Sequence, residues 1–339
     1  MEEESLTIEN TQDESLMAVD AQDDVAPVSN EDESSTVSDT ACESPTSDAE
    51  KASLTVSVVI PTYNESKRIG DCLRALKEGS MQPLEIIVAD GKSKDNTVEI
   101  AKEYGATVVV NEKRHAAGGR NAGLAAAKGD IIAFIDADCI PDRDWLREIH
   151  KAFIEDDIDG LGTYIEPAEP ANKYEEFWGR LSLQILMSYG DEPYYVTEKT
   201  LNTAFITASC AYKRDLLNKL GGFSDYFANN AEDIDLCWRA FDSGAKLKYV
   251  PTAKIIAHSP TTLKGICKKS FRNGISSSKL QKVYSGKRFC IDTKLYKAFW
   301  ANFFRMFIGR KHSFLFVAEL FCHLAGKYWG SIKCGIINL

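Results

Sequence analysis

Residues 131–144 read Ile-Ile-Ala-Phe-Ile-Asp-Ala-Asp-Cys-Ile-Pro-Asp-Arg-Asp. An apolar run long enough for a buried strand ends there in two carboxylates, Asp136 and Asp138. Because side chains alternate along a strand, positions two apart share a face, and both carboxylates can point into the crevice at the carboxyl end of a sheet. Two hard oxygen donors in this arrangement suit Mg²⁺ or Mn²⁺ bridging a diphosphate. Taken alone, the same pattern also fits a turn or a helix cap.

The chain before this stretch alternates between strand and helix patterns. Strands are predicted at 56–61, 84–89, 106–110 and 131–135, with helices at 65–78, 95–104 and 117–128 between them. This rhythm predicts an α/β fold, in which a mostly parallel sheet with right-handed crossovers is flanked by helices.

Beyond Asp142 the pattern is weaker. Helices are expected at 142–153, 174–189 and 213–220 and from Glu232 onward, and strands at 205–212, 247–250 and 255–258. Residues 191–203 read as a loop, and the chain shows no internal repeat.

Charge divides the chain into regions. Residues 1–50 carry 16 acidic and no basic residues and lack aromatic residues, whereas the remainder carries 40 basic and 34 acidic residues. A segment of that composition cannot bury enough apolar surface to offset chain entropy, so residues 1–52 are predicted to be a disordered acidic tail without a secretory signal. The nine cysteines are scattered and show no C-x-x-C, which favours reduced thiols in the cytoplasm.

The segment 261–339 is predicted to be a basic and aromatic helical extension. Residues 260–339 hold 15 Lys and Arg but only Asp292 and Glu319 as acids. Aromatic and apolar residues recur there at helical spacing, and the apolar run 314–326 is short for a spanning helix. An amphipathic pair on the cytoplasmic face of a membrane is therefore expected, with a soluble helical lid or a true span as alternatives.

Five motifs follow one another in the central part of the chain. They are Val-Ile-Pro-Thr-Tyr-Asn-Glu at 59–65, Ile-Ile-Val-Ala-Asp-Gly-Lys-Ser-Lys-Asp-Asn-Thr at 86–97, Gly-Gly-Arg-Asn-Ala-Gly at 118–123, Phe-Ile-Asp-Ala-Asp at 134–138, and Gly-Gly-Phe at 221–223 with Glu-Asp-Ile-Asp-Leu-Cys-Trp-Arg at 232–239. In this order they resemble the family-2 glycosyltransferases over about residues 54–260. The resemblance implies a GT-A nucleotide-sugar transferase fold for a catalytic domain at 53–260, and inverting, metal-dependent transfer of a sugar from a nucleoside-diphosphate donor.

Such a transfer has two barriers, which the acidic motifs address. The departing diphosphate needs its charge stabilised by a divalent cation, and the attacking hydroxyl must lose a proton. The resemblance implies that Asp138 binds the metal directly, that Asp136 lies nearer the ribose or binds metal through water, and that His258 can complete the site. It likewise implies that Asp233 of the Glu232-Asp233 pair is the general base. An alternative role for that pair is to favour a helix N-terminus.

Donor recognition is expected at the ends of the first two strands. The base can be contacted by backbone groups of Pro61 and Thr62 and by the ring of Tyr63. Glu65 is expected to contact the ribose or to orient its own loop. Asp90 is expected to form a hydrogen bond with the base. The resemblance implies that Arg120 and Asn121 face the pocket, with Arg120 a candidate contact to diphosphate or ribose. The second motif reads Ala-Asp-Gly-Lys-Ser, where the family more often has Asp-Asp-Gly-Ser, so the nucleotide base stays open.

The acceptor is expected to be a lipid-linked or surface glycan intermediate that receives one sugar per event. Lys269 and Arg272 are candidates to hold an acceptor phosphate. No nucleic-acid partner is expected. A nucleotidyltransferase and a catalytically silent nucleotide-sugar-binding protein stay as alternatives, whereas the lack of G-x-G-x-x-G after the first strand disfavours a dinucleotide-dependent oxidoreductase.

Overall fold

The computed structural model describes residues 54–186, 190–201, 203–228, 230–286, 289–290, 293–307 and 312–338 of the chain. The predicted acidic tail, residues 1–52, lies outside these residues. The division at 260/261 between a catalytic domain and an extension stays a prediction.

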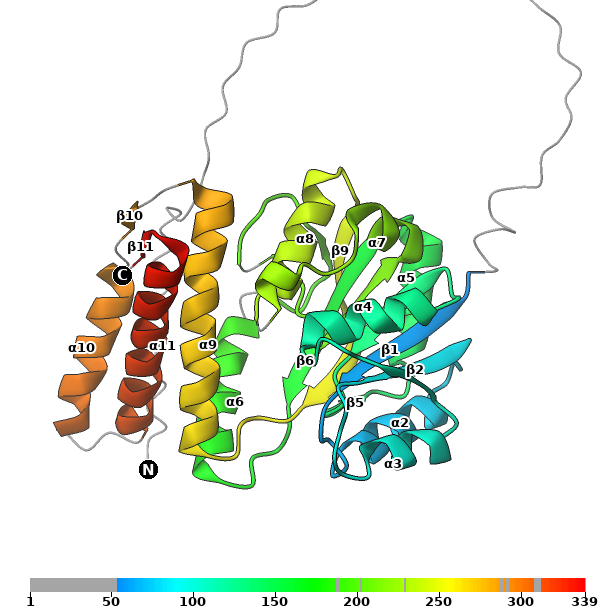
Figure 1. The fold of residues 1–339 in the computed structure, drawn as a ribbon, viewed down its shortest axis with the longest axis horizontal. Helices are drawn as coiled ribbons and strands as arrows, with labels where there is room; N and C mark the ends of the chain where they lie inside the picture. The colour runs from blue at the N-terminus through cyan, green and yellow to red at the C-terminus, as the bar shows by residue number, and fades with distance from the viewer. Residues whose placement is uncertain are drawn as a thin grey trace, which may run out of the picture. The chain divides into compact units, whose positions relative to one another are not determined.

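The first half of the sheet is parallel, as predicted. Its strands lie in the order β3-β2-β1-β4, and every neighbouring pair is parallel. The strands are β1 (Val56–Thr62), β2 (Glu85–Asp90), β3 (Thr107–Val110) and β4 (Ile131–Ile135). The crossovers contain α2 (Ile69–Glu78), α3 (Thr97–Glu103) and α4 (Ala116–Ala126) (Figure 1).

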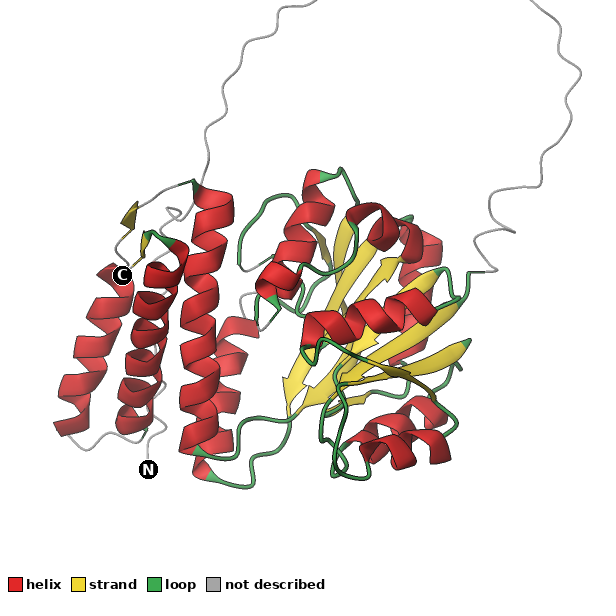
Figure 2. Ribbon diagram, in the orientation of Figure 1, coloured by secondary structure: helices red, strands yellow, loops and turns green. Residues whose placement is uncertain are grey.

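Helices cover both faces of this sheet, as Figure 2 shows. In β4, Ile131, Ala133 and Ile135 join one core cluster, while Ile132 and Phe134 join the other, and all five are fully buried. A strand that is buried on both faces reads as a continuous apolar run. This explains why the stretch before Asp136 has no polar alternation.

The second half of the sheet is mixed. Strand β8 is antiparallel to β4 and β6, and β9 is parallel to β6, so β6 and β9 run in the same direction as β1 to β4. The strands of this half are β5 (Cys139–Pro141), β6 (Gly160–Pro167), β7 (Tyr194–Tyr195), β8 (Ser209–Lys213) and β9 (Leu247–Ala257). The helices are α5 (Trp145–Asp156), α6 (Lys173–Leu186), α7 (Arg214–Leu220) and α8 (Glu232–Asp242).

Some boundaries differ from the sequence prediction. Strands β5 and β6 were not predicted, and β9 is a single strand where two short ones were expected. The expected loop 191–203 contains the short strand β7. The end of the helix expected at 174–189 lies outside the described residues from 187 onward.

Three helices follow the sheet: α9 (Leu263–Leu280), α10 (Thr293–Phe307) and α11 (Ser313–Cys334). Helix α11 contacts both α9 and α10, and α9 contacts α6 (Figure 1). A short helical turn, η3 (Gln281–Ser285), extends α9, and strands β10 (Phe289–Cys290) and β11 (Ile337–Asn338) pair in parallel. Among the described helices, none has both the length and the apolar character needed to cross a membrane.

Glycines set the close approach of α9 and α11. A Cβ atom on Gly274 would stand 2.1 Å from the carbonyl oxygen of His323, and one on Gly326 would stand 2.1 Å from the carbonyl oxygen of Phe271. Real side chains do not tolerate such distances to backbone atoms, so the two helices can pack this closely only because both positions lack a side chain.

Replacing Gly274 with Ala is expected to lower the free energy of unfolding by about 1–3 kcal/mol, because the helices must move apart. Equilibrium denaturant unfolding of the purified protein measures this change. Gly70→Ala is the matched control: its Cβ would meet only Ile100 Cγ2, at 3.7 Å. The control is expected to be neutral or slightly stabilising, because Ala has the higher helix propensity. Equal stability of both variants would contradict the close packing.

Candidate functional site

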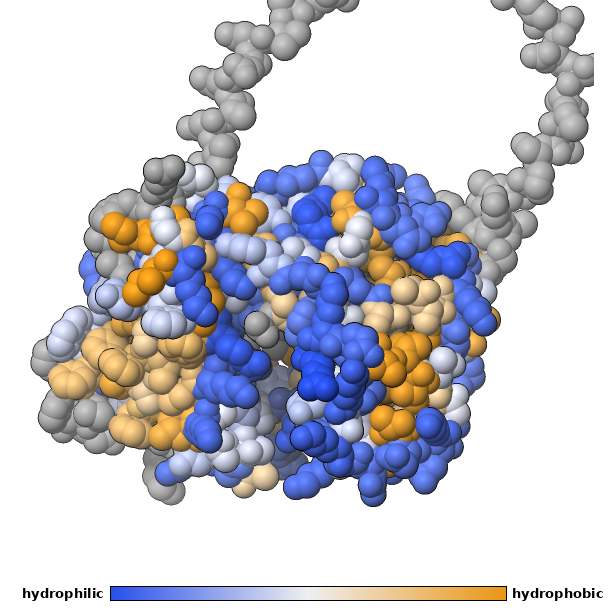
Figure 3. Space-filling model, viewed as in Figure 1, coloured by the Kyte–Doolittle hydropathy of each residue, from blue (hydrophilic) through white to orange (hydrophobic). Residues whose placement is uncertain are grey.

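A cavity of about 650 Å³ lies at the carboxyl ends of β1 and β4. The start of α8 and one side of α9 form its other walls. Figure 3 shows the surface hollowed beside α9, with hydrophilic side chains around the hollow. Twelve of the fourteen predicted site residues line the cavity: Pro61, Thr62, Tyr63, Glu65, Arg120, Asp136, Asp138, Glu232, Asp233, His258, Lys269 and Arg272. Residues more than 200 positions apart in the chain therefore meet in one place.

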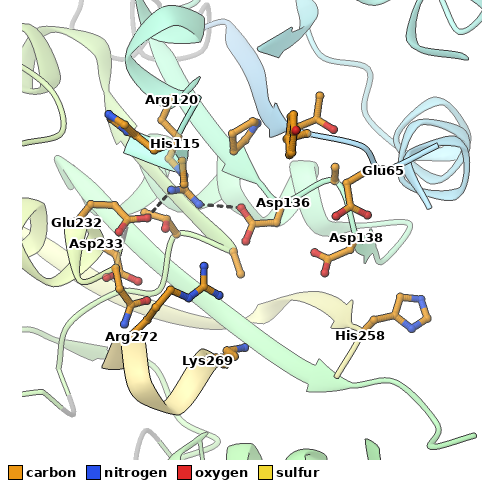
Figure 4. A pocket seen from close by; sticks show the side chains of 18 of the residues that line it. Glu65, His115, Arg120, Asp136, Asp138, Glu232, Asp233, His258, Lys269 and Arg272 are labelled. Atoms are coloured by element: carbon orange, nitrogen blue, oxygen red, sulfur yellow. Dashed lines mark hydrogen bonds and ion pairs between the residues drawn. The ribbon is translucent and has the colours of Figure 1, made fainter. Parts of the chain in front are cut away.

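Arg120 is the buried centre of this site. Its Nη2 donates to Asp136 Oδ1 at 2.7 Å and its Nη1 donates to Glu232 Oε1 at 2.8 Å (Figure 4). The guanidinium also lies over the ring of Phe223, with Cζ 5.7 Å from the centroid. Arg120 thus joins the acid at the end of β4 to the acid at the start of α8. The predicted direct contact to a donor stays a prediction, and the structure gives this side chain two protein partners.

Glycines on both sides of Arg120 let its helix come this close to the sheet. A Cβ atom on Gly119 would stand 3.0 Å from Pro61 Cβ, and one on Gly123 would stand 2.2 Å from Val59 Cγ1. Helix α4 therefore lies directly against β1, which explains the Gly-Gly-Arg-Asn-Ala-Gly spacing. His115 caps this helix, with its Nδ1 accepting from the backbone N–H of Gly118 at 2.9 Å.

Glu232 and Asp233 begin α8 and form the acidic pair on the other side of the cavity. Burial raises the pKa of Glu232 to about 7, although the Arg120 charge opposes the shift. Burial also raises the pKa of Asp233, against the hydrogen bond that its Oδ1 accepts from the backbone N–H of Ile234 at 2.9 Å. Ala231, the residue before the pair, has φ of 67°, a left-handed conformation that side-chain-bearing residues rarely adopt. The backbone is therefore held in a strained turn where the pair enters the cavity.

Asp138 is the more available of the two acids after β4. Its Oδ2 lies 3.6 Å from Arg68 Nη1, and its Oδ1 accepts a weak contact from the Cys139 thiol at 3.8 Å. Figure 4 shows its carboxylate pointing into the cavity, near Glu65. Burial raises the pKa of Glu65, and the charge of Asp138 raises it further. This is a local excess of negative charge, which a cation can neutralise.

The donor set at Asp136 and Asp138 fits a hard divalent cation. Carboxylate oxygens suit Mg²⁺ or Mn²⁺, and Mg²⁺ is commonly held by one or two carboxylates together with substrate phosphates. The described residues contain no group of three or more His, Cys, Asp or Glu side chains placed to hold a metal ion. The predicted set of Asp138, Asp136 and His258 is thus not assembled. His258 lines the cavity just after β9, where its side chain is exposed, and ligation by it stays a prediction.

Two predicted donor contacts have partners away from the cavity. Asp90 is buried, and its oxygens accept from the backbone N–H and the hydroxyl of Ser93, at 2.9 and 2.5 Å. Asn121 holds the backbone of Phe223 through two hydrogen bonds of 2.8 Å. Neither residue lines the cavity. Asp90 therefore shapes the loop after β2, and Asn121 fixes the Gly-Gly-Phe turn.

Several cavity residues were not predicted from the sequence. They include Arg68, Arg114, His115 and Asn230. Arg68 follows the first motif by three residues, and His115 precedes the third motif by three. Their proximity to those motifs is the signal that could have identified them.

The fold and the cavity define an α/β protein of the GT-A type. Residues 57–221 match the sequence model described as glycosyl transferase family 2. Over these residues, just under half of the chain, the sequence is similar to the family 2 glycosyl transferases.

Curated relatives agree with this similarity. The chain is 29% identical over 232 residues to the pre-mycofactocin glycosyltransferase of Mycobacterium tuberculosis, and the matched region covers 65% of this chain and 46% of the relative. It is 28% identical over 232 residues to glycosyltransferase AglE of Haloferax volcanii, and this match covers 65% of this chain and 71% of the relative. The chain thus spans about half the length of the mycobacterial relative.

Solved structures share the fold. S. aureus TarS 1–349 superposes with a TM-score of 0.52 at 20% identity, covering 65% of each chain. The mannosyltransferase PcManGT from Pyrobaculum calidifontis, in complex with GDP-Man and Mn²⁺, superposes with a TM-score of 0.50 at 21% identity, covering 83% of this chain and 73% of that one. At these identities the superpositions establish the GT-A fold and nothing further.

The raised pKa of Glu232 predicts a dependence of stability on pH. In the folded protein its pKa is about 7, above the ordinary value of 4.5, so the folded state holds the proton more tightly than the unfolded state. Its contribution to stability is full below pH 4.5 and is lost as the pH rises through 7. Glu232→Gln is expected to remove the pH dependence that this carboxyl gives to the free energy of unfolding, which is at most about 1.4 kcal/mol per pH unit. Denaturant unfolding of both proteins at several pH values across this window measures the difference, and parallel pH profiles would contradict the burial argument.

Proposed function

We propose that this protein transfers a sugar from a nucleoside-diphosphate sugar to an acceptor hydroxyl, with inversion at the anomeric carbon and with a divalent cation bound. One observation carries the proposal. Asp136 and Asp138 after β4, and Glu232 and Asp233 at the start of α8, line a single cavity in a domain that is similar to the family 2 glycosyl transferases. A cavity of about 650 Å³ is within the usual range of about 300–1,000 Å³ for small-molecule sites.

In this proposal Asp138 holds the cation directly and Asp136 lies beside it. When bound, the cation stabilises the charge that develops on the departing diphosphate. The half-buried carboxylate of Asp138, whose ion pair with Arg68 is long at 3.6 Å, and the negative charge near Glu65 support this assignment. The structural neighbour PcManGT is described with GDP-Man and Mn²⁺, which agrees with a divalent cation.

Asp233 is the proposed general base. Its carboxylate accepts the proton of the acceptor hydroxyl while the hydroxyl oxygen attacks the anomeric carbon. Burial raises the pKa of Asp233, which makes its carboxylate a stronger base than an exposed aspartate. Attack from the side opposite the leaving diphosphate gives inversion without a covalent intermediate. Arg120 orients both Asp136 and Glu232, so it is a positioning residue in this scheme.

The proposed place of action is a membrane surface, where a lipid-linked or glycan acceptor would be presented. Helix α11 exposes large apolar side chains that recur at helical spacing: Phe314, Phe321, Tyr328, Trp329 and Ile332. Figure 3 shows apolar side chains gathered over α10 and α11. Lys333 lies beside this face, with Nζ 5.5 Å from the centroid of the Trp329 ring. An apolar face with amphipathic aromatic and basic residues suits the interface of a bilayer.

The donor assignment is tested with a panel of UDP-, GDP- and dTDP-sugars in Mn²⁺ or Mg²⁺. One donor is expected to raise the melting temperature and to be hydrolysed slowly, and Asp138→Asn is expected to abolish both effects because the cation loses its ligand. Asp233→Asn is expected to keep donor binding but to lower transfer about 10²–10⁴-fold, because the base is lost. Donor binding without any turnover, in every condition, would favour a silent binding protein. Binding that ignores metal and Asp138 would overturn the proposed metal site.

Membrane docking is tested by co-sedimentation with vesicles that contain anionic phosphatidylserine. Phe321 is 63% exposed on α11, and Phe321→Asp is expected to weaken vesicle binding about ten- to hundredfold, because a buried Phe contributes about 1.5–3 kcal/mol. Leu84→Asp is the matched control, since Leu84 is 53% exposed but lies before β2. Equal binding of both variants would show that α11 does not face the bilayer.

A further inference from the structure

Helix α9 lies outside residues 57–221 and yet forms a wall of the cavity. Lys268, Lys269 and Arg272 project from this helix and line the same space as Asp136 and Asp138. Their spacing of one and then three residues keeps them on one side of the helix. Figure 4 shows Lys269 and Arg272 extending from α9 toward the acidic side of the cavity.

These three cations have no anionic partner among the described residues. Two other arginines of the cavity do face carboxylates: Arg68 faces Asp138, and Arg120 faces Asp136 and Glu232. Lys269 is held instead over the buried ring of Trp178, with Nζ 4.9 Å from the centroid. Desolvation lowers the pKa of Lys269, as does the nearby charge of Arg272, while Asp138 and Asp136 raise it. Several positive charges are thus kept close together, and none of them forms a direct ion pair with a carboxylate of the described residues.

Helix α9 is also fixed to the loop that precedes the proposed base. Asn230 Nδ2 donates to Asn273 Oδ1 at 2.7 Å, and the Ser276 hydroxyl donates to the backbone oxygen of Asn230 at 3.1 Å. Asn230 stands two residues before Glu232. The cations of α9 therefore keep a set position relative to Glu232 and Asp233, as a binding site requires.

We propose that Lys268, Lys269 and Arg272 form a subsite for the phosphate or diphosphate group of the acceptor. The inference rests on the proposed function, in which the donor diphosphate is held on the opposite side of the cavity at Asp136 and Asp138. A cluster of unpaired cations binds a phosphate dianion through charge-assisted hydrogen bonds, and a guanidinium can do so through two parallel bonds. The acceptor is then a phosphorylated molecule whose reacting hydroxyl lies close to its phosphate, because both must fit within the cavity.

The same chemistry can come from a lipid phosphate or from a water-soluble sugar phosphate. Two probes distinguish these sources: inorganic pyrophosphate, which has only the anionic group, and farnesyl diphosphate, which adds an apolar chain. Isothermal titration calorimetry of the full-length protein in EDTA excludes binding through a metal ion. Equal affinity for both probes would point to recognition of the phosphate alone, whereas tighter binding of farnesyl diphosphate would point to a lipid-linked acceptor.

The double variant Lys269→Gln, Arg272→Gln is expected to weaken the binding of pyrophosphate at least about tenfold, because two charge-assisted contacts are lost. Lys264→Gln is the matched control, since Lys264 is an exposed lysine of the same helix that does not line the cavity. It is expected to bind as the wild type does. Arg272→Gln alone, which removes only an exposed side chain, is expected to show an intermediate loss and guards against a folding defect in the double variant.

Arg68→Gln tests the donor side of the cavity, since Arg68 is the cation beside Asp138. If pyrophosphate binding is lost in this variant and kept in the α9 variants, the anion binds at the donor side and the subsite is overturned. Absence of pyrophosphate binding to the wild type would overturn it as well. Binding through α9 by a protein that turns over no nucleotide sugar would instead keep the subsite and refute the proposed reaction, so the two failures are distinguishable.

Discussion

The buried guanidinium of Arg120 is the interaction on which the rest of the site depends. A buried charge is tolerated only when it is paired, and Arg120 has two carboxylate partners, Asp136 and Glu232. These partners come from opposite sides of the cavity, one following the central strand and the other beginning α8. Because breaking a buried pair leaves an uncompensated charge, the ion pairs fix the distance between the two acidic motifs. Arg120 thus turns two separate pieces of chain into one site.

The sheet explains why an arginine of α4 can reach both acids. Strand β4 is buried on both faces, so its end can project Asp136 and Asp138 only at the edge of the sheet. Helix α4 packs against β1, the neighbour of β4, at a distance that Gly119 and Gly123 permit. The first polar side chain that follows Gly119 is therefore placed beside the end of β4. The spacing of Gly119 and Gly123 sets the distance between α4 and β1. That distance in turn allows Arg120 to reach its carboxylate partners.

Much of this arrangement could be predicted because the signals are local. The five apolar residues of β4 and the acids after them identify a buried strand that ends at a site. Strand β6 could not be predicted, since Gly160 and Gly162 interrupt its apolar pattern to make room for Tyr212 and Phe205 of other segments. Strand β9 continues through Pro251, where the register of its partner β6 shifts between Thr163 and Tyr164. Asp90 accepts hydrogen bonds from Ser93, three residues further on, and these compete with the predicted contact to a nucleotide base. The motif alone does not reveal them.

Close packing at glycines also positions the far wall of the cavity, which is formed by α9. Gly274 and Gly326 let α11 approach α9 so closely that one face of α9 is occupied by helix packing, while Lys268, Lys269 and Arg272 line the cavity. Clusters of unpaired like charges repel one another, so a helix that keeps three of them in a cavity is less stable than one that disperses them. Asn273 and Ser276 hold that helix in place through Asn230. Packing on one face of α9 and hydrogen bonds near the proposed base together hold the cations where an anion can neutralise them.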